Sequence, residues 1–400
     1  MKTVVVVGTL DTKGEAYGYL KERIEEFGVR TIVIDWGMMN EPCFKPDISA
    51  SEVARACGKD IAEIRAGERA ESIGVMASGV VKIVKELRSR GELDGIIVLG
   101  GGQGSSIAIE VFSALPIGLP KVIVSTAPGM VTRSGGLRDA FVVGSIVDIA
   151  GLNGILKAVL QNAAAAIAGV VNAWKEPDEG AKPRIAATML GVTTGCVDNV
   201  REILTGKGYE VLVFHANGNG GASMEDLIGQ GYFTGVVDVT TAEIASYLTN
   251  RDPKLKGRLE AAGKAGVPQV VSLGGLDRIN ISGEDVPEKY KGRKIGWHNP
   301  RTLMIRTSAE ENEEFGKVIA GKLNKAKGKT ALAIPLRGIS VDDREGNFFY
   351  DPAANKALFD SVRKNLNPNI DVVEMDCHIM DTAFTDKLTE LILELTGGGL

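Results

Sequence analysis

Thr3-Val4-Val5-Val6-Val7, followed by Gly8-Thr9-Leu10-Asp11-Thr12-Lys13-Gly14, is the stretch of sequence that decides the fold of this chain. The first five residues form an uninterrupted β-branched run, which is typical of a strand buried on both faces of a parallel sheet. The next seven form a polar turn, after which residues 15–27 have helical spacing and residues 30–34 predict a second strand. This order predicts a strand–helix–strand unit and hence a doubly wound parallel sheet.

The same alternation continues and then restarts in the second half of the chain. Predicted strands cover residues 96–99, 121–125, 140–143, 184–190, 210–214, 235–239, 269–272, 330–335 and 371–375, and predicted helices cover 51–56, 70–89, 105–115, 196–206, 223–228, 310–325 and 386–395. We therefore predict an α/β protein with two Rossmann-like domains, each a mostly parallel sheet flanked by helices. The domains are residues 1–175 and 184–400. The charged, proline-containing residues 176–183 form the predicted linker.

Composition narrows the classes of function. The 400 residues include 46 Lys and Arg against 51 Asp and Glu, a formal charge of −5, without the basic stripe that nucleic-acid binding needs. The N-terminal apolar run ends at Gly8, and the apolar segment 158–174 is interrupted by Gln161 and Asn162, which favours a buried or subunit-facing helix. The four cysteines are widely spaced, which indicates reduced thiols. We expect a cytoplasmic protein with no nucleic-acid or membrane partner.

The first turn, Gly8 to Gly14, carries groups that suit a phosphate. It offers the hydroxyls of Thr9 and Thr12, the Asp11 carboxylate and the Lys13 ammonium at the start of a helix, where free N–H groups attract anions. Lys13 is predicted to neutralise a phosphate and Asp11 to hold magnesium, directly or through water. The alternative is that Asp11 or Thr12 caps the helix and Lys13 is a surface charge.

A second turn, Gly100-Gly101-Gly102-Gln103-Gly104-Ser105-Ser106, follows another predicted strand. Consecutive glycines let the backbone approach a ligand closely, and their N–H groups form an anion nest. The turn lacks the Lys-Ser/Thr pair of a Walker A loop and the third glycine of the dinucleotide fingerprint. A third turn, Ser125-Thr126-Ala127-Pro128-Gly129, adds hydroxyls for ribose or phosphate. The predicted nucleotide contacts are Gly8, Thr9, Asp11, Thr12, Lys13, Gly101, Gly102, Gln103, Gly104, Ser105, Ser125 and Thr126.

The second half has a candidate site of its own. His215-Ala216-Asn217-Gly218-Asn219-Gly220-Gly221 follows a predicted strand and leads into a helix, so its glycines suit an anionic group. His215 is either a general acid/base or a hydrogen-bonded structural residue. Thr194 and Asp277 also follow strands and are expected at the same sheet edge, which makes His215, Thr194 and Asp277 the candidate catalytic set. Glu243 follows Thr240 by three residues, which matches a capping box.

These turns, in this order, resemble a large uncharacterised family that is named for its ATP-binding domain and is similar to the tomato tobamovirus-resistance protein. The matching segments are 8–14, 100–106, 125–126, 147–153, 191–194, 214–221, 238–243, 298–300 and 338–340. The resemblance covers nearly the whole chain and implies two Rossmann-like domains, ATP bound in the first, and dimerisation. This chain departs from the family's usual Gly-Gly-Ser-Gly-Gly-Thr at residues 101–106, and from its usual Ala-Ser-Gly at 127–129.

Two classes of function stay open. One is an ATP-dependent enzyme, with ATP and Mg²⁺, that acts on a small anionic metabolite at an interdomain cleft. The other is a nucleotide-gated binding or regulatory protein without turnover. The resemblance assigns no reaction, and its plant member acts by binding a viral replication protein. The polar residues of the second half favour the enzyme, and a homodimer or higher homo-oligomer is expected. A nicotinamide dehydrogenase ranks third because the fingerprint is absent.

Overall fold

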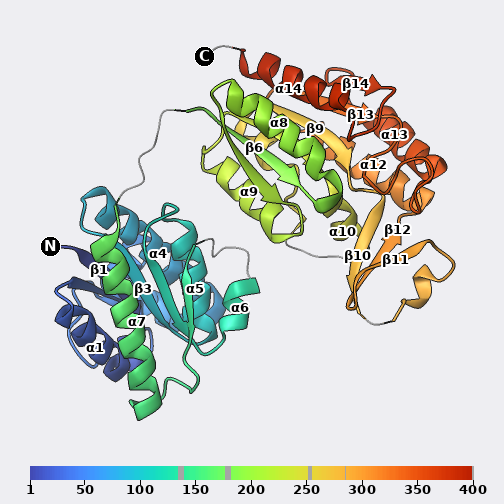
Figure 1. Ribbon diagram of the computed structural model, residues 1–400. Coiled ribbons are helices and arrows are strands. Elements are labelled where there is room, and N and C mark those ends of the chain that lie inside the picture. Colours follow the sequence, from blue (N-terminus) through green and yellow to red (C-terminus); the bar gives the residue numbers. More distant parts are fainter. Residues whose placement is uncertain (134–138, 176–181, 251–254, 284, 399–400) are drawn as a thin grey trace. The chain divides into compact units, whose positions relative to one another are not determined.

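Two parallel sheets, one in each half of the chain, organise the structure (Figure 1). The computed structural model describes residues 1–133, 139–175, 182–250, 255–283 and 285–398. The chain divides into a first unit, Met1–Glu179, and a second unit, Gly180–Leu400, and each is described by itself. Most of the predicted linker, residues 176–181, lies outside the described residues. Both sheets are flanked by helices, which confirms the predicted fold class.

The first unit has a five-stranded parallel sheet in the order β2-β1-β3-β4-β5. Its strands are β1 (Thr3–Gly8), β2 (Arg30–Asp35), β3 (Gly95–Gly100), β4 (Lys121–Ser125) and β5 (Phe141–Gly144). Val5 of β1 pairs with Ile32 on one side and Ile96 on the other. Val4 and Val6 pack into one hydrophobic layer, and Val5 and Val7 into the opposite one. Burial of each valine contributes about 1.5–3 kcal/mol, which is why this run specifies a central strand.

Helices cover both faces of the first sheet. They are α1 (Leu10–Glu26), α2 (Ala50–Ala56), α3 (Ile61–Ala66), α4 (Arg69–Ser89), α5 (Gly102–Ser113), α6 (Pro128–Arg133) and α7 (Gly154–Ala173). Helices α1 and α7 cover one face, and α2, α4 and α5 cover the other. Among the described residues, α7 is the one helix long and apolar enough to span a membrane. It packs Leu160 and Ile167 onto the sheet, as the core helix of an α/β domain does.

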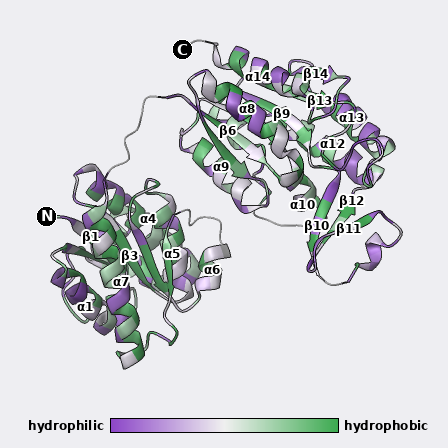
Figure 2. Ribbon diagram, in the orientation of Figure 1, coloured by the Kyte–Doolittle hydropathy of each residue, from purple (hydrophilic) through white to green (hydrophobic). Residues whose placement is uncertain are grey.

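The second unit has a six-stranded parallel sheet in the order β14-β13-β9-β8-β6-β7. Its strands are β6 (Arg184–Met189), β7 (Glu210–His215), β8 (Gly235–Thr240), β9 (Gln269–Gly274), β13 (Thr330–Pro335) and β14 (Asp371–Met375). Figure 2 shows hydrophobic residues concentrated on the central strands of both sheets. In each sheet the first strand lies between the second and the third, so strand order reverses at β1/β3 and at β6/β8. Ligands of open α/β sheets bind at the carboxyl ends of the strands beside such a switch point.

Helices and a small second sheet complete the second unit. The helices are α8 (Thr194–Gly206), α9 (Asn219–Gly229), α10 (Ala242–Asn250), α11 (Ala261–Ala265), α12 (Ala309–Leu323), α13 (Pro352–Asn365) and α14 (Thr382–Thr396). The second sheet is antiparallel and contains β10 (Arg278–Ser282), β12 (Thr302–Arg306) and β11 (Ile295–Asn299). It was not predicted, because its strands have only five residues each and are separated by polar segments with glycine and proline, although β10 alternates polar and apolar residues as a strand does.

Helix α1 begins at Leu10, five residues earlier than the predicted helix 15–27. The Asp35 carboxylate at the end of β2 accepts a hydrogen bond from the Leu10 amide at 2.9 Å and so caps the helix from a distance. The alternative in which Asp11 or Thr12 is the cap is therefore wrong. Lys13 has non-helical dihedral angles, φ −131° and ψ 18°, which kink the first turn. The polar residues predicted in a loop thus lie on the first turn of α1.

Candidate functional site

A cavity of about 490 Å³ lies in the first unit where the ends of β1 and β3 meet. Its walls come from the start of α1, the segment after β2, helix α3 with the start of α4, and the glycine turn after β3. The lining residues are Thr9, Asp11, Thr12, Lys13, Trp36, Met38, Met39, Ile64, Arg65, Gly67, Arg69, Ser72, Leu99, Gly100, Gly101, Gly102, Gln103 and Gly104. The structure therefore brings together most of the residues predicted for the first two turns, at the β1/β3 switch point.

Asp11 ties the start of α1 to the segment after β2. Its Oδ2 accepts hydrogen bonds from the amides of Met39 (2.8 Å) and Asn40 (3.3 Å). Its Oδ1 is buried and has no hydrogen-bond partner within the described part of the chain. Gly37 packs directly on this carboxylate, since a Cβ there would lie 2.6 Å from Asp11 Cγ. One oxygen is thus structural, and the other lacks the partner that buried polar atoms usually have.

Asp35 lies close beneath the same turn. Burial raises the pKa of its carboxyl group, and hydrogen bonds from the Leu10 and Gly37 amides offset part of this rise. The hydroxyl of Thr12 donates to that of Thr9 at 3.0 Å. Lys13 Nζ donates to the carbonyl of Ile149 at 3.3 Å, so it joins α1 to the segment before α7. The lysine is positioned rather than free on the surface.

The glycines of the turn after β3 have two different roles: Gly100 and Gly104 pack against neighbouring backbone, whereas Gly102 faces open space. A Cβ at Gly100 would lie 3.1 Å from Gly104 Cα, and one at Gly104 would lie 3.4 Å from the Leu99 carbonyl oxygen. These two glycines allow β3 and α5 to approach each other. Gly102, the first residue of α5, is exposed and would meet nothing within 4 Å. No side chain caps the start of α5 at Gly101, so N–H groups there are available to an anion.

Residues missed by sequence reasoning make up much of the remaining wall. Trp36, Met38 and Ile64 give the cavity an apolar side, and Arg65 and Arg69 add two cations. Trp36 is 3% exposed, and its indole Nε1 is buried without a partner in the described ranges. Trp36 directly follows β2, so the strand-end rule that found the other turns would have found it. No local pattern marks the two arginines.

Three predicted contacts have internal roles instead, and this corrects the sequence interpretation. A Cβ at Gly8 would fall within the ring of Tyr17, whose hydroxyl bonds the main chain of Val7 and Leu99. The hydroxyls of Ser105 and Ser125 are buried 2.8 Å apart. The amide of Thr126 donates to the Gly100 carbonyl at 3.2 Å. Gly8, Ser105 and Ser125 therefore hold the turns together and do not line the cavity. The Thr126 side chain is exposed next to Gly101, so its predicted contact stays a prediction.

The corresponding switch point of the second unit, between β6 and β8, is filled by protein groups. The hydroxyls of Thr193 and Thr240 lie 2.8 Å apart, both fully buried. The Thr188 hydroxyl donates to Asp238 at 2.6 Å, and Asp238 accepts two hydrogen bonds from the Arg258 guanidinium at 2.6 and 2.7 Å. Burial alone would lower the pKa of Arg258, but the Asp238 carboxylate raises it well above its usual value. The buried guanidinium stays charged.

Glu243 occupies the glycine loop that was predicted to bind an anion. Its Oε1 accepts from the amides of Gly218 (2.5 Å) and Gly221 (3.2 Å), and its Oε2 accepts from Arg258 Nε (2.6 Å). A Cβ at Gly221 would overlap the carboxylate, which explains a glycine there. The capping-box interpretation of Glu243 is wrong, because its side chain binds this loop instead. Loop amides that suit a phosphate are here taken by an internal carboxylate.

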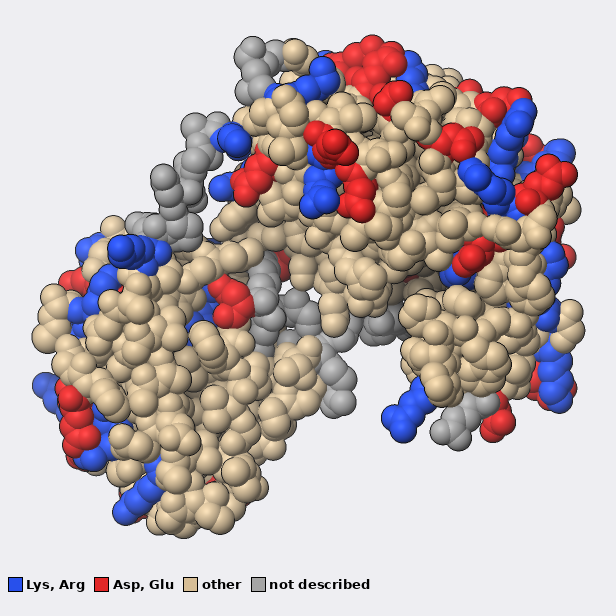
Figure 3. Space-filling view, viewed as in Figure 1, with Lys and Arg blue, Asp and Glu red and all other residues tan. Residues whose placement is uncertain are grey.

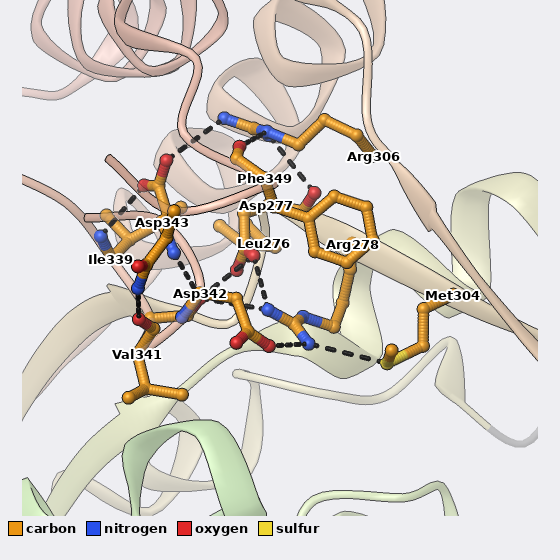
Figure 4. A network of polar contacts seen from close by, with 12 residues as sticks. Leu276, Asp277, Arg278, Met304, Arg306, Ile339, Val341, Asp342, Asp343 and Phe349 are labelled. Carbon is orange, nitrogen blue, oxygen red and sulfur yellow. Dashed lines mark hydrogen bonds and ion pairs between the residues drawn. The ribbon is translucent and has the colours of Figure 1, made fainter. Parts of the chain in front are cut away.

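The three predicted catalytic residues are not brought together. Asp277 is fully buried, and its Oδ2 binds Arg278 (2.8 Å) and the Ser340 hydroxyl (2.9 Å) in the network of Figure 4. The Thr194 hydroxyl donates to the Leu190 carbonyl at 3.0 Å. His215 is exposed at the end of β7, three strand spacings from β9, or about 14 Å from the strand that precedes Asp277. Asp277 and Thr194 have structural contacts, which corrects the proposed convergence.

The described residues contain no group of three or more His, Cys, Asp or Glu side chains placed to hold a metal ion. Magnesium in nucleotide sites is often held by one or two carboxylates plus phosphate oxygens. Asp11 fits that pattern only together with a phosphate. On the face shown in Figure 3, basic and acidic side chains are interspersed in both units, without a continuous basic stripe.

Fold and cavity together define a two-unit Rossmann-like α/β protein with a cavity of about 490 Å³ in its first unit. The chain belongs to the uncharacterised protein family UPF0261: residues 2–176 match the N-terminal domain of that family and residues 182–396 its C-terminal domain. A UPF0261 protein of Clostridium tetani is 43% identical over 98% of this chain and 99% of its own length. The ToMV resistance protein Tm-1(GCR237) of Solanum lycopersicum is 35% identical over 98% of this chain and 56% of its own length. The similarity to the tomato protein confirms that part of the resemblance.

The solved structures that match this chain share little sequence with it, and their TM-scores are low. The UDP-GlcNAc 2-epimerase of Methanocaldococcus jannaschii is 9% identical, with a TM-score of 0.22 over 68% of this chain and 83% of that one. The Neisseria meningitidis enzyme is 10% identical, with a TM-score of 0.22 over 68% and 82%.

Proposed function

We propose that the first unit binds a nucleoside phosphate, ATP with magnesium, and that the chain is a nucleotide-binding protein of the binding or regulatory class. The observation that carries this proposal is the cavity of about 490 Å³ at the β1/β3 switch point. Its size lies within the roughly 300–1,000 Å³ of small-ligand sites. Its wall combines the uncapped start of α5 and three cations with an apolar side, as a phosphate chain joined to a base requires.

The polarity of the cavity suggests how such a ligand lies. Phosphates fit the amides at the start of α5 near Gly102, where the helix dipole favours negative charge. The base fits the side formed by Trp36, Met38 and Ile64. Asp11 would hold magnesium jointly with the phosphates.

Within its described residues, the second unit does not provide the group of catalytic side chains that an enzyme would need. Thr194 and Asp277 are engaged in internal contacts, and the loop beside His215 is closed by Glu243. A binding or regulatory role therefore accounts for more of the geometry than an enzymatic one. Homodimerisation and a cytoplasmic location stay predictions, and light scattering with and without ATP tests the first of them.

Calorimetry of the full chain with ATP, ADP and AMP, each with magnesium, tests the proposal. Bound ATP is expected to raise the melting temperature, because a ligand at a hundred times its Kd adds about 2.7 kcal/mol to folding. No binding of any of the three at millimolar concentration would refute a nucleotide site.

Gly102→Val sharpens the test, because its side chain enters open space at the mouth of the turn and leaves the fold intact. It should abolish binding without lowering the melting temperature. Gly191→Val is the matched control: it follows β6 in the second unit and also meets nothing within 4 Å. Equal binding by both variants would show that the glycine turn is only structural. Gly104→Val is unsuitable, because Gly104 is buried against Leu99.

A further inference from the structure

Three cationic side chains line the first-unit cavity: Lys13, Arg65 and Arg69. They differ in how much of their charge is already balanced by contacts within the protein. Lys13 Nζ is bound to the Ile149 carbonyl. Arg65 acts on a buried carboxylate: burial raises the pKa of Asp35, and the Arg65 charge offsets part of the rise. Arg69 is exposed, and its polar contact is with the neutral Gln103 amide. Arg69 therefore has the most charge left to offer a ligand.

The acidic residue next to Arg69 in the sequence, Glu68, already accepts hydrogen bonds from main-chain amides. Glu68 caps helix α4, and its carboxylate accepts hydrogen bonds from the amides of Ala70 (2.8 Å) and Glu71 (3.1 Å). The guanidinium instead extends toward the glycine turn. It comes from the first residue of α4, across the cavity from α5, so it can reach a ligand that sits on the α5 amides.

The contact between Arg69 and Gln103 resembles a guanidinium–phosphate contact. Arg69 Nη2 lies 3.4 Å from Gln103 Oε1. With the amide turned so that its oxygen faces the guanidinium, that oxygen accepts from Nε at 2.9 Å and from Nη2 at 3.0 Å. Nε and Nη2 then both point at the amide, and a phosphate in its place can accept from each of them with a separate oxygen, as in a bidentate arginine–phosphate pair. The amide oxygen stands where a phosphate oxygen would be held.

We propose that Arg69 binds the distal phosphates of the nucleotide and so selects nucleoside di- and triphosphates over monophosphates, with Gln103 holding its place when no ligand is bound. This inference rests on the proposed nucleotide site and names its ligand class. A charged phosphate displaces the neutral amide because it adds an opposite charge to the guanidinium's hydrogen bonds, whereas the amide offers only a dipole.

Calorimetric titration of the full chain with ATP, ADP and AMP, with and without magnesium, tests the assignment. Arg69→Ala should weaken ATP on the order of tenfold, ADP less, and AMP not at all, because one or two charge-assisted hydrogen bonds are lost. Arg69→Lys should recover part of the loss, since it keeps the charge without the fork. Arg90→Ala is the matched control, because Arg90 is an exposed arginine at the other end of the same helix.

The outcomes separate this inference from the site itself. Wild-type protein that binds no nucleotide refutes the proposed function, before any variant is made. ATP affinity that is unchanged in Arg69→Ala, or reduced equally for ATP, ADP and AMP, overturns the role of Arg69 and leaves the site standing. Gln103→Ala should keep or strengthen ATP binding. A loss as large as that of Arg69→Ala would mean that Gln103 itself holds the phosphate, against the placeholder role.

Discussion

The two units have the same strand order at their switch points, but the first switch point borders a cavity and the second is filled by side chains. In the first unit the ends of β1 and β3 border a cavity of about 490 Å³, and polar atoms of Asp11 and Trp36 are left without described partners. In the second unit the ends of β6 and β8 are joined by the Thr193–Thr240 pair, with Arg258 beneath. Topology sets where a ligand site can form, and side chains decide whether it stays open.

The glycine-rich loops teach the same lesson. The turn at Gly102 begins α5 without a side-chain cap, whereas the amides of Gly218 and Gly221 already bind Glu243. Both loops look equally suited to an anion in the sequence. A carboxylate from the protein can satisfy such amides as well as a ligand can. A glycine-rich loop therefore indicates a site for an anionic group, but it does not show whether that group belongs to a ligand or to a side chain of the protein.

Arg258→Met should have the largest effect, and it tests whether the second switch point is held closed by charge. The guanidinium is 1% exposed and contacts the carboxylates of Asp238, Glu243 and Glu225. Removing it leaves buried carboxylates unpaired, at a cost of about 3–5 kcal/mol. Hydrogen exchange should show the second unit opening, while ATP binding by the first unit persists.

Arg344→Met is the control for that change. Arg344 pairs with Asp381 at the surface, with both side chains about half exposed, so its loss should cost at most about 1 kcal/mol. Equal effects of the two substitutions would show that the buried network is not what stabilises the second unit.

A pH dependence is the next largest effect, and it arises in the second unit. Burial, with the nearby Asp277 carboxylate, raises the pKa of Asp343 from 3.8 to about 6. The folded state then holds the proton more tightly than the unfolded chain. The stabilisation is fully present below pH 3.8 and is lost as the pH rises through about 6. Two pKa units correspond to about 3 kcal/mol.

Urea unfolding between about pH 4 and pH 7, followed by hydrogen exchange in the second unit, measures this dependence. Other carboxyl groups titrate in the same range, so the informative quantity is the difference from Asp343→Asn. The asparagine can still accept from the Ile339 amide, which Asp343 contacts at 3.0 Å. Parallel curves for the two proteins would contradict the raised pKa.

The fold was largely readable from the sequence, because buried strands in a parallel sheet are continuous β-branched runs. Val4 to Val7 and the residues of β3 and β4 have that form. The antiparallel sheet was missed because its strands are only partly buried. β11, for example, is exposed at Trp297 and His298. Where burial does not impose a pattern, the sequence carries little signal for a strand.

About half of the candidate site could be predicted from the sequence, namely the residues that directly follow strands. Thr9 to Lys13 and the glycine turn follow strands directly, so the strand-end rule places them at the cavity. Arg65 and Arg69 come from helices between β2 and β3, and only the tertiary fold brings them there. In the second unit, residues 240–243 have the spacing of a capping box. Nothing local indicates that Arg258 lies opposite Glu243.

Thr240→Val is a smaller perturbation of the closed switch point. Valine keeps the shape but removes the hydroxyl that bonds Thr193 (2.8 Å) and the Thr188 carbonyl (3.0 Å). The buried partners lose a hydrogen bond, which should cost about 1–3 kcal/mol by thermal unfolding. Thr249→Val is the control, because within the described residues its hydroxyl donates to the Ala245 carbonyl of its own helix. A cost no greater than that of the control would mean that the hydroxyl pair does not close this crevice.

Lys13→Ala should have the smallest effect. It tests whether the lysine at the first-unit cavity contributes to nucleotide binding. Lys13 lines the cavity and donates to the Ile149 carbonyl at 3.3 Å, so its charge is already partly engaged. A partly exposed charge contributes up to about 1 kcal/mol, so ATP affinity should fall severalfold, less than in Arg69→Ala. AMP should be affected less than ATP if the ammonium addresses distal phosphates. Equal losses for ATP and AMP, together with a lower melting temperature, would assign Lys13 to anchoring the segment before α7. Calorimetry with both nucleotides and a thermal scan of the free protein distinguish the two roles.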